Sequence, residues 1–358
     1  MIYLDNAATT PLTPVVQQAM QVAEQQYYFN ANTTYAGGML AHQHIEQARR
    51  TLLRKLHGES GQLIFTAGAT QANHLIMAHK IKRPEHQLVI TAGDHNSIDL
   101  YAKDLAHQGF TVATAPLHRD GTIDLPGTVA LINEHTTLLT FSLVNSDIGT
   151  YQDAAQLVTA VRAKYPRVHI HADAAQAFAK FDFNVTQLGL DSVTICAHKI
   201  HGPKGIGALW MRSGITLPPV HGTLNNAGII GFATAAETFT GTHVPALHNY
   251  LVTNLPAGCQ VNGINNNPYI TNIALPNVYG ETVLNALSSQ GIYVGLGSAC
   301  AAHSANNRTL AAMKQNHQQQ KQVLRISFGT QNTLADVQAL LAALVTVLQT
   351  IGRHKITQ

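Results

Sequence analysis

The sequence has 358 residues, enough to bury one large hydrophobic core and a second, smaller one, so we expect one or two domains. Charged residues make up only 11% of the chain, against a usual share of about 25%, and the formal net charge is +3. The chain has no long basic run, so neither nucleic acid nor an acidic membrane surface is an expected partner. The 20 histidines include no HExxH or other compact pattern, so no metal site is predicted.

The amino-terminal residues Met1–Asn6 form neither a basic region nor an apolar leader. No apolar stretch approaches the roughly 18 residues that suggest a membrane span. The three cysteines, Cys196, Cys259 and Cys300, are odd in number and far apart, which argues against a disulfide framework. We therefore expect a soluble protein of the reducing cytoplasm, without a membrane partner.

Thr13 followed by Pro14 marks the start of the first helix, as an N-cap and a first-turn proline. Strand-like and helix-like patterns then alternate from about residue 60 to residue 212. The expected strands are 62–65, 88–90, 110–113, 138–144, 168–172 and 192–196. The expected helices among them are 70–79, 97–107, 128–132 and 154–164. This alternation predicts a mainly parallel sheet with helices on both faces.

The pattern changes near residues 241–245, beyond which loops rich in Asn and Gly join shorter βα units. The final helix carries an apolar stripe with the spacing of a core-facing side, made of Leu334, Val337, Leu341, Leu344 and Leu348. We predict a large domain of residues 14–243 and a smaller α+β domain of residues 1–13 and 244–358, with the functional site between them.

Lys199 stands beside His198, just ahead of the glycines and proline of a tight turn. Upstream, the apolar strand pattern 168–172 ends in Asp173. A buried lysine has a lowered pKa and can attack a carbonyl to form a Schiff base. Pyridoxal phosphate (PLP) requires such a lysine and an acid that faces its pyridinium nitrogen, so the pair suits PLP. Taken alone, Lys199 is equally well explained as a surface lysine.

Three further segments place polar residues after predicted strands. Residues 65–73 pass through a turn of small residues into a helix, whose free N–H groups and dipole suit a phosphate, although Thr70 is also typical of an ordinary N-cap. His95 could stack on a cofactor ring and move protons, or be a satisfied polar residue. Asn145 could bond a phenolic oxygen or a substrate carboxylate, or cap its own loop.

Cysteine desulfurases carry the same motifs in the same order, namely 5–11, the Gly-Ala-Thr turn 68–70, His95, Asn145, Asp173 with Gln176, and 198–205. The sequence resembles this family, within the class V aminotransferase group of fold-type-I PLP-dependent enzymes, from residue 3 to about 212 and again through residue 330. The resemblance implies an α/β fold of that type. Its large domain has a mainly parallel seven-stranded sheet between helices, and its C-terminal domain is smaller and α+β.

The resemblance also implies a role for each matching residue. Lys199 is the Schiff-base lysine, Asp173 the partner of the pyridine nitrogen, and His95 the residue stacked on the ring. The other cofactor contacts that it implies are Ala69, Thr70, Asn145, Gln176, Cys196, His198 and Thr223, the last toward the phosphate of a neighbouring subunit. Asn145 and Arg325 bind the substrate, since a guanidinium can bond both oxygens of a carboxylate. The alternative for Arg325 is a cation at a surface strand end.

Cys300 follows Gly297-Ser298-Ala299, where the family carries the cysteine that attacks the sulfur of substrate L-cysteine. The implied products are alanine and an enzyme persulfide, with Lys199 removing the Cα proton and His95 as an acid. The loop 301–307 suits an accessible, partly ionised thiol; the alternative is a buried structural cysteine. The sulfur then passes to an acceptor protein of the scaffold or tRNA-thiolation type, as in iron–sulfur cluster assembly.

The chain departs from the family in four places. Cys196 stands where a serine or threonine is usual, Gln71 replaces a glutamate, and the region 239–261 is short. A Gly- and Arg-rich segment is missing between Gly222 and Thr223, although the retained threonine still implies a homodimer. Two other functions therefore stay open. One is a selenocysteine lyase or another PLP β-lyase, and the other is a PLP-binding partner or regulatory subunit with little turnover. Cys259 matches no family role and is interpreted as packing.

Overall fold

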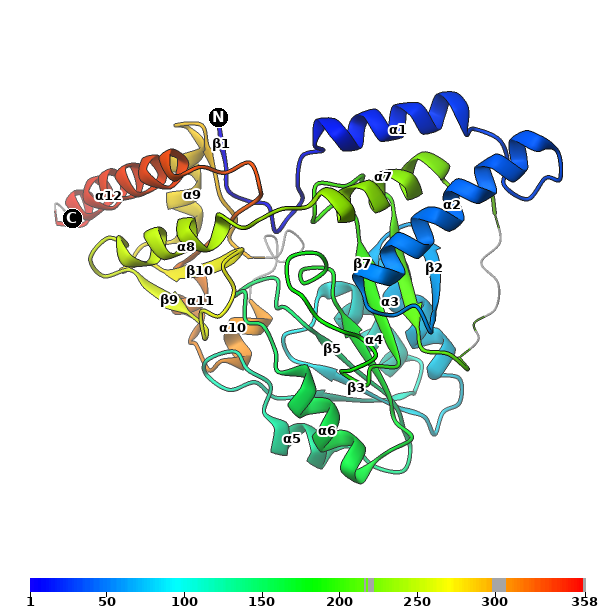
Figure 1. Ribbon diagram of the computed structural model, residues 1–358. Helices are drawn as coiled ribbons and strands as arrows, with labels where there is room; N and C mark the ends of the chain where they lie inside the picture. The colour runs from blue at the N-terminus through cyan, green and yellow to red at the C-terminus, as the bar shows by residue number, and fades with distance from the viewer. Residues whose placement is uncertain (216, 218–221, 298–306, 357–358) are drawn as a thin grey trace.

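The computed structural model describes the chain apart from residues 216, 218–221, 298–306 and 357–358, and of residues 352–356 it describes only the backbone. A large sheet with its helices is built from the first two thirds of the described chain (Figure 1). A three-stranded sheet and the last five helices follow it in sequence, and a two-stranded sheet pairs the first strand of the chain with a late one.

The large sheet has seven strands, and it confirms the predicted α/β class. Its strands are β2 (Gln62–Thr66), β3 (Gln87–Thr91), β4 (Thr111–Ala115), β5 (Thr136–Ser142), β6 (His169–Asp173), β7 (Ser192–Cys196) and β8 (Gly207–Met211). They lie in the order β2-β8-β7-β6-β5-β3-β4. Strand β8 runs antiparallel to both of its neighbours, while all other pairs are parallel. Strand β8 is the one member of this sheet that the sequence pattern did not predict.

Seven helices accompany this sheet in the described chain. They are α1 (Pro14–Gln26), α2 (Ala36–Lys55), α3 (Ala69–Lys80), α4 (Asn96–His107), α5 (Leu125–Leu131), α6 (Ala154–Lys164) and α7 (Asn226–Thr238). Helices α1, α2 and α7 pack together (Figure 1), and α3 packs against α4, β7 and β8. Thr13 occupies the N-cap of α1 as expected, but its side chain makes no capping hydrogen bond.

The two ends of the chain meet away from the large sheet. Strands β9 (Gln260–Asn262), β10 (Ile270–Ala274) and β12 (Val323–Ser327) form an antiparallel sheet, and β1 (Ile2–Tyr3) pairs in parallel with β11 (Ile292–Tyr293). The helices of this region are α8 (Val244–Thr253), α9 (Gly280–Ser288), α10 (Arg308–Ala312), α11 (His317–Lys321) and α12 (Leu334–Ile356). The first residues of the chain thus pair with a strand from the C-terminal part of the sequence.

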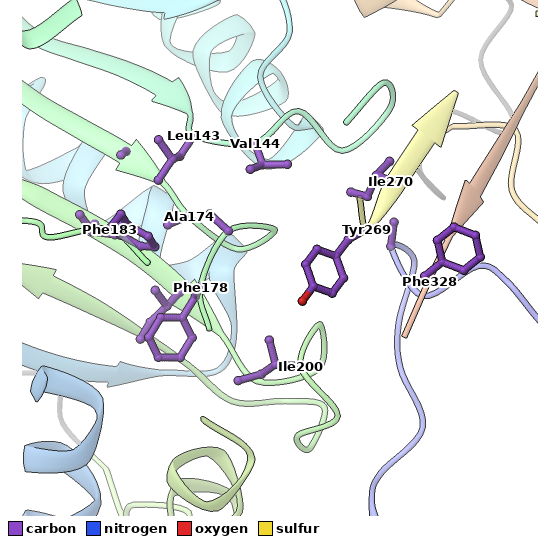
Figure 2. Close-up of a cluster of buried hydrophobic side chains, with 14 of the residues drawn as sticks. Leu143, Val144, Ala174, Phe178, Phe183, Ile200, Tyr269, Ile270 and Phe328 are labelled. Atoms are coloured by element: carbon purple, nitrogen blue, oxygen red, sulfur yellow. The ribbon is translucent and has the colours of Figure 1, made fainter. Parts of the chain in front are cut away.

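One hydrophobic core cluster joins the two parts. Leu143 and Phe178, beside the large sheet, belong to the same buried cluster as Tyr269 and Phe328 beside β10 and β12 (Figure 2). Phe178 also meets Phe232 of α7 edge to face, with 5.8 Å between ring centroids. Apolar contacts are therefore continuous across the junction between the two parts.

Helix α12 corrects one expectation from the sequence. Its window Leu334–Ile351 has a mean hydropathy of 1.7 and is long and apolar enough to cross a membrane, whereas no such stretch was predicted. A core helix passes the same test of length and hydropathy. Val337, Leu340 and Leu344 are fully buried in the main core, and α12 packs against α8 and α9. Of the predicted stripe, Val337, Leu341 and Leu344 pack internally, whereas Leu334 at the start of the helix is exposed.

Candidate active site

A cavity of about 850 Å³ lies where β6 and β7 end, bordered by the start of α3 and by the amino-terminal segment. Ligand sites in open α/β sheets form beyond the carboxyl ends of the strands. Of the predicted site residues, those that line the cavity are Ala69, Thr70, His95, Asp173, Gln176, Cys196, His198, Lys199 and Arg325. Segments separated by more than two hundred residues thus converge on one space.

Lys199 follows β7 and is partly buried in the cavity wall. Its Nζ donates hydrogen bonds to the carbonyl oxygens of Ala7 and Ala8, the second at 2.7 Å. Burial lowers the pKa of Lys199 to about 8. A neutral amine is therefore accessible near physiological pH, and the surface-lysine alternative is wrong.

Asp173 is the last residue of β6 and is only 6% exposed. Its Oδ1 accepts a hydrogen bond from the backbone N–H of Ala175 at 2.9 Å. Its Oδ2 accepts another from Nδ2 of Asn73 on α3 at 2.8 Å. Two donors thus fix the plane of this carboxylate beside the cavity.

His95 caps the first turn of α4. Its Nδ1 accepts a hydrogen bond from the backbone N–H of Ser97 at 3.1 Å. Burial lowers the pKa of His95 below its ordinary value, so the ring is neutral at physiological pH. With Nδ1 accepting, the proton of the neutral ring lies on Nε2.

The start of α3 has the features of an anion site. Gly68 occupies the N-cap with φ of 150°, and no side chain caps the helix. The first-turn N–H groups, including those of Ala69 and Thr70, are therefore free of a protein cap. Because Gly68 holds the N-cap position, the N-cap alternative for Thr70 is wrong.

The last residue of β7, Cys196, and His198 just after it complete the lining near Lys199. His198 places Nδ1 3.2 Å from Oγ1 of Thr9, and burial lowers the pKa of His198 to about 3, so the ring is neutral. Cys196 is fully buried, and burial raises the pKa of its thiol to about 12. Thr223 is exposed and is not part of the cavity lining.

Gln176 is held by hydrogen bonds at both ends of its amide. Nε2 donates to the carbonyl of Ala7 at 2.9 Å, and Oε1 accepts from Nζ of Lys180 at 3.1 Å. An ammonium or amine donor requires an acceptor, so the oxygen of Gln176 must face Lys180. Burial lowers the pKa of Lys180 to about 7. No motif of the sequence indicates a role for this lysine.

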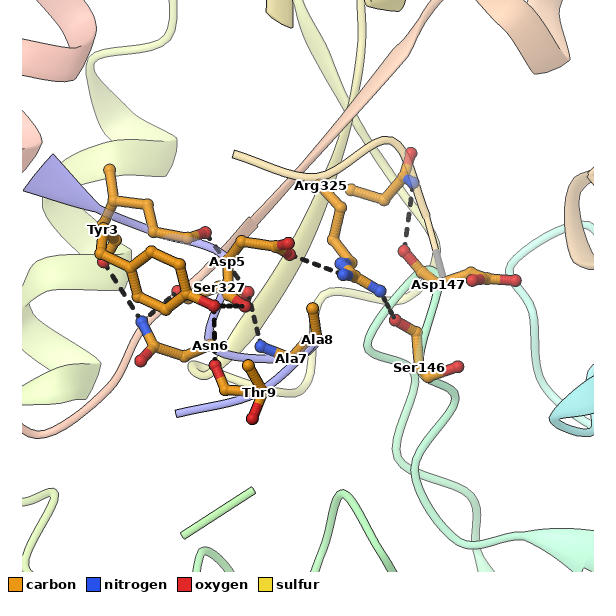
Figure 3. Close-up of polar contacts among 12 residues, drawn as sticks. Tyr3, Asp5, Asn6, Ala7, Ala8, Thr9, Ser146, Asp147, Arg325 and Ser327 are labelled. Atoms are coloured by element: carbon orange, nitrogen blue, oxygen red, sulfur yellow. Dashed lines mark hydrogen bonds and ion pairs between the residues drawn. The ribbon is translucent and has the colours of Figure 1, made fainter. Parts of the chain in front are cut away.

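Arg325 of β12 lines the cavity and is 1% exposed, so the surface-cation alternative is wrong. Figure 3 shows its guanidinium between Asp5, with Nη2 2.6 Å from Oδ1, and Ser146, whose carbonyl accepts from Nη1 at 2.9 Å. Its Nε is buried and has no hydrogen-bond partner among the described residues. A Cβ at Gly295 would stand 2.7 Å from that same Asp5 oxygen, so glycine allows the ion pair to pack.

Asn145 was a predicted site residue but is not part of the cavity lining. Asn145 is buried and caps its own loop: its Oδ1 accepts from the backbone N–H groups of Asp147 and Ile148, and its Nδ2 donates to the carbonyl of Gly93. That is the loop-capping alternative. Cys300 lies outside the described residues. Cys259 is half-buried against the main core, in keeping with packing.

Several residues of the site escaped the sequence analysis. Asn73 and Ser97 follow the recognised residues by a few positions, and Asp5 opens the first motif, so nearness to a motif was the available signal. Their hydrogen bonds join residues that lie far apart in sequence. Asn73 and Ser97 are 24 residues apart, Asn73 and Asp173 are 100 apart, and Asp5 and Arg325 are 320 apart. The cavity thus combines a buried amine, a fixed carboxylate, a neutral imidazole, an anion-binding helix end and a partly free guanidinium.

Comparisons with known proteins agree with this arrangement. The Aminotransferase class-V family model matches residues 2–220 and 219–340. A cysteine desulfurase of Nostoc sp. is 31% identical over 85% of this chain and 82% of its own length. The cysteine desulfurase IscS 1 of Archaeoglobus fulgidus is 28% identical over 98% of this chain and 97% of its own. A solved structure described as a NifS-like protein superimposes with a TM-score of 0.89 at 27% identity, covering 98% of this chain and 99% of that one. The chain therefore belongs to the class-V aminotransferase family and, within it, to the cysteine desulfurases.

Proposed function

We propose that this protein binds PLP and removes the sulfur of L-cysteine, releasing L-alanine and leaving the sulfur as a persulfide on Cys300. The observation that carries the proposal is the buried amine of Lys199 in one cavity with the carboxylate of Asp173 and the imidazole of His95. The cysteine desulfurases named above support the choice of substrate.

The cavity residues fit PLP. Lys199 supplies the amine for the aldehyde, and Asp173 supplies the carboxylate for the pyridine nitrogen. The uncapped start of α3 suits a phosphate, and nothing lies within 4 Å of the position that a Cβ would take at Gly68. When bound, PLP supplies a conjugated ring that takes up the electron pair left by a departing Cα proton.

The protein residues then divide the remaining work. Arg325 binds the substrate carboxylate, for which its unpartnered Nε is one donor. Lys199 takes the Cα proton on Nζ, which its lowered pKa allows near neutral pH. His95 holds a proton on Nε2 and donates it. The Cys300 thiolate forms a bond to the substrate sulfur while the bond between that sulfur and Cβ breaks. The electron pair of the broken bond stays with Cβ, and protonation of this carbon gives alanine.

We further propose that a protein acceptor takes the persulfide sulfur, that the reaction occurs in the cytoplasm and that the enzyme works as a homodimer. The free thiols of Cys196 and Cys259 support a reducing compartment. Exposed apolar side chains on and between α1 and α2, among them Tyr28, Tyr35 and Met39, support a surface covered by a second copy. Size-exclusion chromatography with light scattering should give twice the mass of one chain, and a single-chain mass contradicts the dimer.

The test is to supply PLP and L-cysteine to the purified protein with a thiol and to measure alanine and sulfide. Lys199→Ala should lower the rate by at least about 10³-fold, because the proton acceptor is lost. Cys300→Ser should abolish sulfide release, yet still exchange the Cα proton of L-alanine in D₂O, since that exchange needs no thiol.

Cys259→Ser is the matched control and should keep full activity. Full activity of Cys300→Ser contradicts the persulfide step. Faster turnover of selenocysteine that is insensitive to Cys300→Ser favours a selenocysteine lyase. Absence of turnover in a PLP-loaded protein contradicts the proposal and favours a regulatory subunit.

A further inference from the structure

Asn73 is a fully buried asparagine inside helix α3, and its amide contacts three separate groups. Its Nδ2 lies 2.8 Å from Oδ2 of Asp173 and 3.0 Å from Oγ of Ser97. Its Oδ1 lies 3.1 Å from Nε2 of His171. Asparagine is a poor residue for a helix interior, because its side chain competes for backbone hydrogen bonds. Its presence here is explained by these contacts.

The chemistry of Asp173 fixes which way the amide of Asn73 faces. An ionised carboxylate only accepts hydrogen bonds, so the nitrogen of Asn73 must face Asp173. The oxygen of Asn73 then faces Nε2 of His171 and requires a proton on that nitrogen. Thr194 Oγ1, at 3.3 Å from the same Nε2, can share this proton. Nε2 of His171 therefore donates a hydrogen bond to Oδ1 of Asn73.

The hydrogen bonds on the other side of the His171 ring follow the same donor-to-acceptor order. Burial lowers the pKa of His171 to about 3, so with Nε2 protonated its Nδ1 is an acceptor. Ser192 Oγ lies 2.7 Å from that Nδ1 and donates to it. Nε2 of His169 lies 2.7 Å from the same Oγ, and burial lowers the pKa of His169 to about 2. The neutral His169 therefore donates to Ser192. Each group in the series His169, Ser192, His171, Asn73 and Asp173 thus donates a hydrogen bond to the next.

A second branch leads from Asn73 to His95. Ser97 accepts the other Nδ2 proton of Asn73, and its Oγ lies 3.1 Å from Nδ1 of His95. The hydroxyl and the backbone N–H of Ser97 both approach this nitrogen. With donors directed at Nδ1, the proton of neutral His95 is on Nε2.

We propose that Asn73 is a positioning residue that prepares both groups for the cofactor ring, holding Asp173 as an acceptor for the pyridine nitrogen and His95 as a donor through Nε2. This inference rests on the proposed function, because it concerns PLP bound beside Asp173. Asn73 touches no reacting atom and acts through the two side chains that it orients. Its two donor hydrogens are what Asp173 and Ser97 require.

Asn73→Asp tests the proposal, since it keeps the shape of the side chain and removes both donors. The readouts are the dissociation constant of PLP and the ¹⁵N NMR signal of PLP labelled at the ring nitrogen, bound to the protein at neutral pH. We expect a protonated ring nitrogen in the unaltered protein. In Asn73→Asp the new carboxyl group faces Asp173 and no longer donates to it. We expect PLP binding to weaken at least tenfold and the ¹⁵N signal to be that of an unprotonated ring nitrogen.

Asn73→Ala removes the donors without adding charge, and it provides the test if Asn73→Asp does not fold. It should weaken PLP binding several-fold and lower the pH at which the ring nitrogen loses its proton. Ile76→Ala, on the same buried face of α3, is the packing control and should destabilise the fold without moving the ring-nitrogen titration. Equal titrations for unaltered protein and both Asn73 variants overturn this inference alone. Failure of the unaltered protein to bind PLP overturns the proposed function as well.

Discussion

Cys196 brings a weak hydrogen-bond donor to the anion-binding end of the cavity. It ends β7, lines the cavity and is fully buried, and its thiol is neutral because burial raises its pKa to about 12. A neutral thiol bonds a phosphate oxygen less well than a hydroxyl does. In the proposed PLP complex we therefore expect the start of α3 and the residues after β7 to contribute more of the phosphate binding.

Cys196→Ser should tighten PLP binding about tenfold, because a hydrogen bond to a charged group contributes about 1.5 kcal/mol. Without PLP the same change should destabilise the protein by about 1 kcal/mol, since the new hydroxyl is buried without an acceptor. PLP titration by absorbance and urea unfolding of the cofactor-free protein measure the two effects. Unchanged or weaker PLP binding contradicts this assignment, and Cys259→Ser serves as control.

Helix α10 connects the segment that contains Cys300 to the helix that carries His95. Arg308, at its first position, makes an ion pair with Asp99 of α4 at 2.6 Å and donates to the carbonyl of Asp94 at 2.9 Å. Thr309 donates to Oδ2 of Asp147 at 2.9 Å. The first residues of α10 thus bind to residues that adjoin His95 and Ser146 of the cavity lining.

Arg308→Gln should lower alanine production roughly 10- to 100-fold, because small displacements of a reacting group are costly. PLP affinity and the exchange of the Cα proton of L-alanine should stay unchanged, since neither needs the thiol. Arg83→Gln is the matched control, because Arg83 pairs with Glu85 only at the surface. Parallel loss of exchange and alanine production means that Arg308 supports the whole site rather than the thiol.

The sequence predicted elements well where periodicity is local, and less well where pairing is distant. Helix 154–164 agrees with α6 residue by residue, because its apolar spacing lies within one element. Strand β8 was missed because the short apolar run 207–211 has no alternation, and its place between β2 and β7 depends on distant partners. Lys199 and Asp173 were predicted from local motifs, whereas Asn73 and Arg308 resemble any polar residue of a helix until the fold gives them partners.

At the scale of the whole molecule, buried neutral histidines make the stability depend on pH. Burial lowers the pKa of His169 to about 2 and that of His171 to about 3. The unfolded chain binds protons at these sites below about pH 6.5, which the folded chain does not. Their contribution to stability is therefore complete above about pH 6.5 and is lost as the pH falls toward the folded values.

His169→Gln should reduce this dependence by up to about 1.4 kcal/mol per pH unit between about pH 6 and 4.5, because one proton fewer is taken up on unfolding. Urea unfolding at several pH values measures the slope. His107→Gln, at the exposed end of α4, should leave it unchanged. An unaltered slope in His169→Gln means that His169 is protonated in the folded protein.

The position of the first residues has a consequence for synthesis on the ribosome. Ala7 and Ala8 hold the amine of Lys199, the N–H of Ala7 donates to Ser327 Oγ at 2.8 Å, and Asp5 holds Arg325. The residues of the large sheet are translated before residue 327. Asp5 and Ala7 can therefore contact Arg325 and Ser327 only after the large sheet has been made. A chain that stops before residue 325 therefore lacks the side chains of Arg325 and Ser327 that hold Asp5 and Ala7 in place beside Lys199.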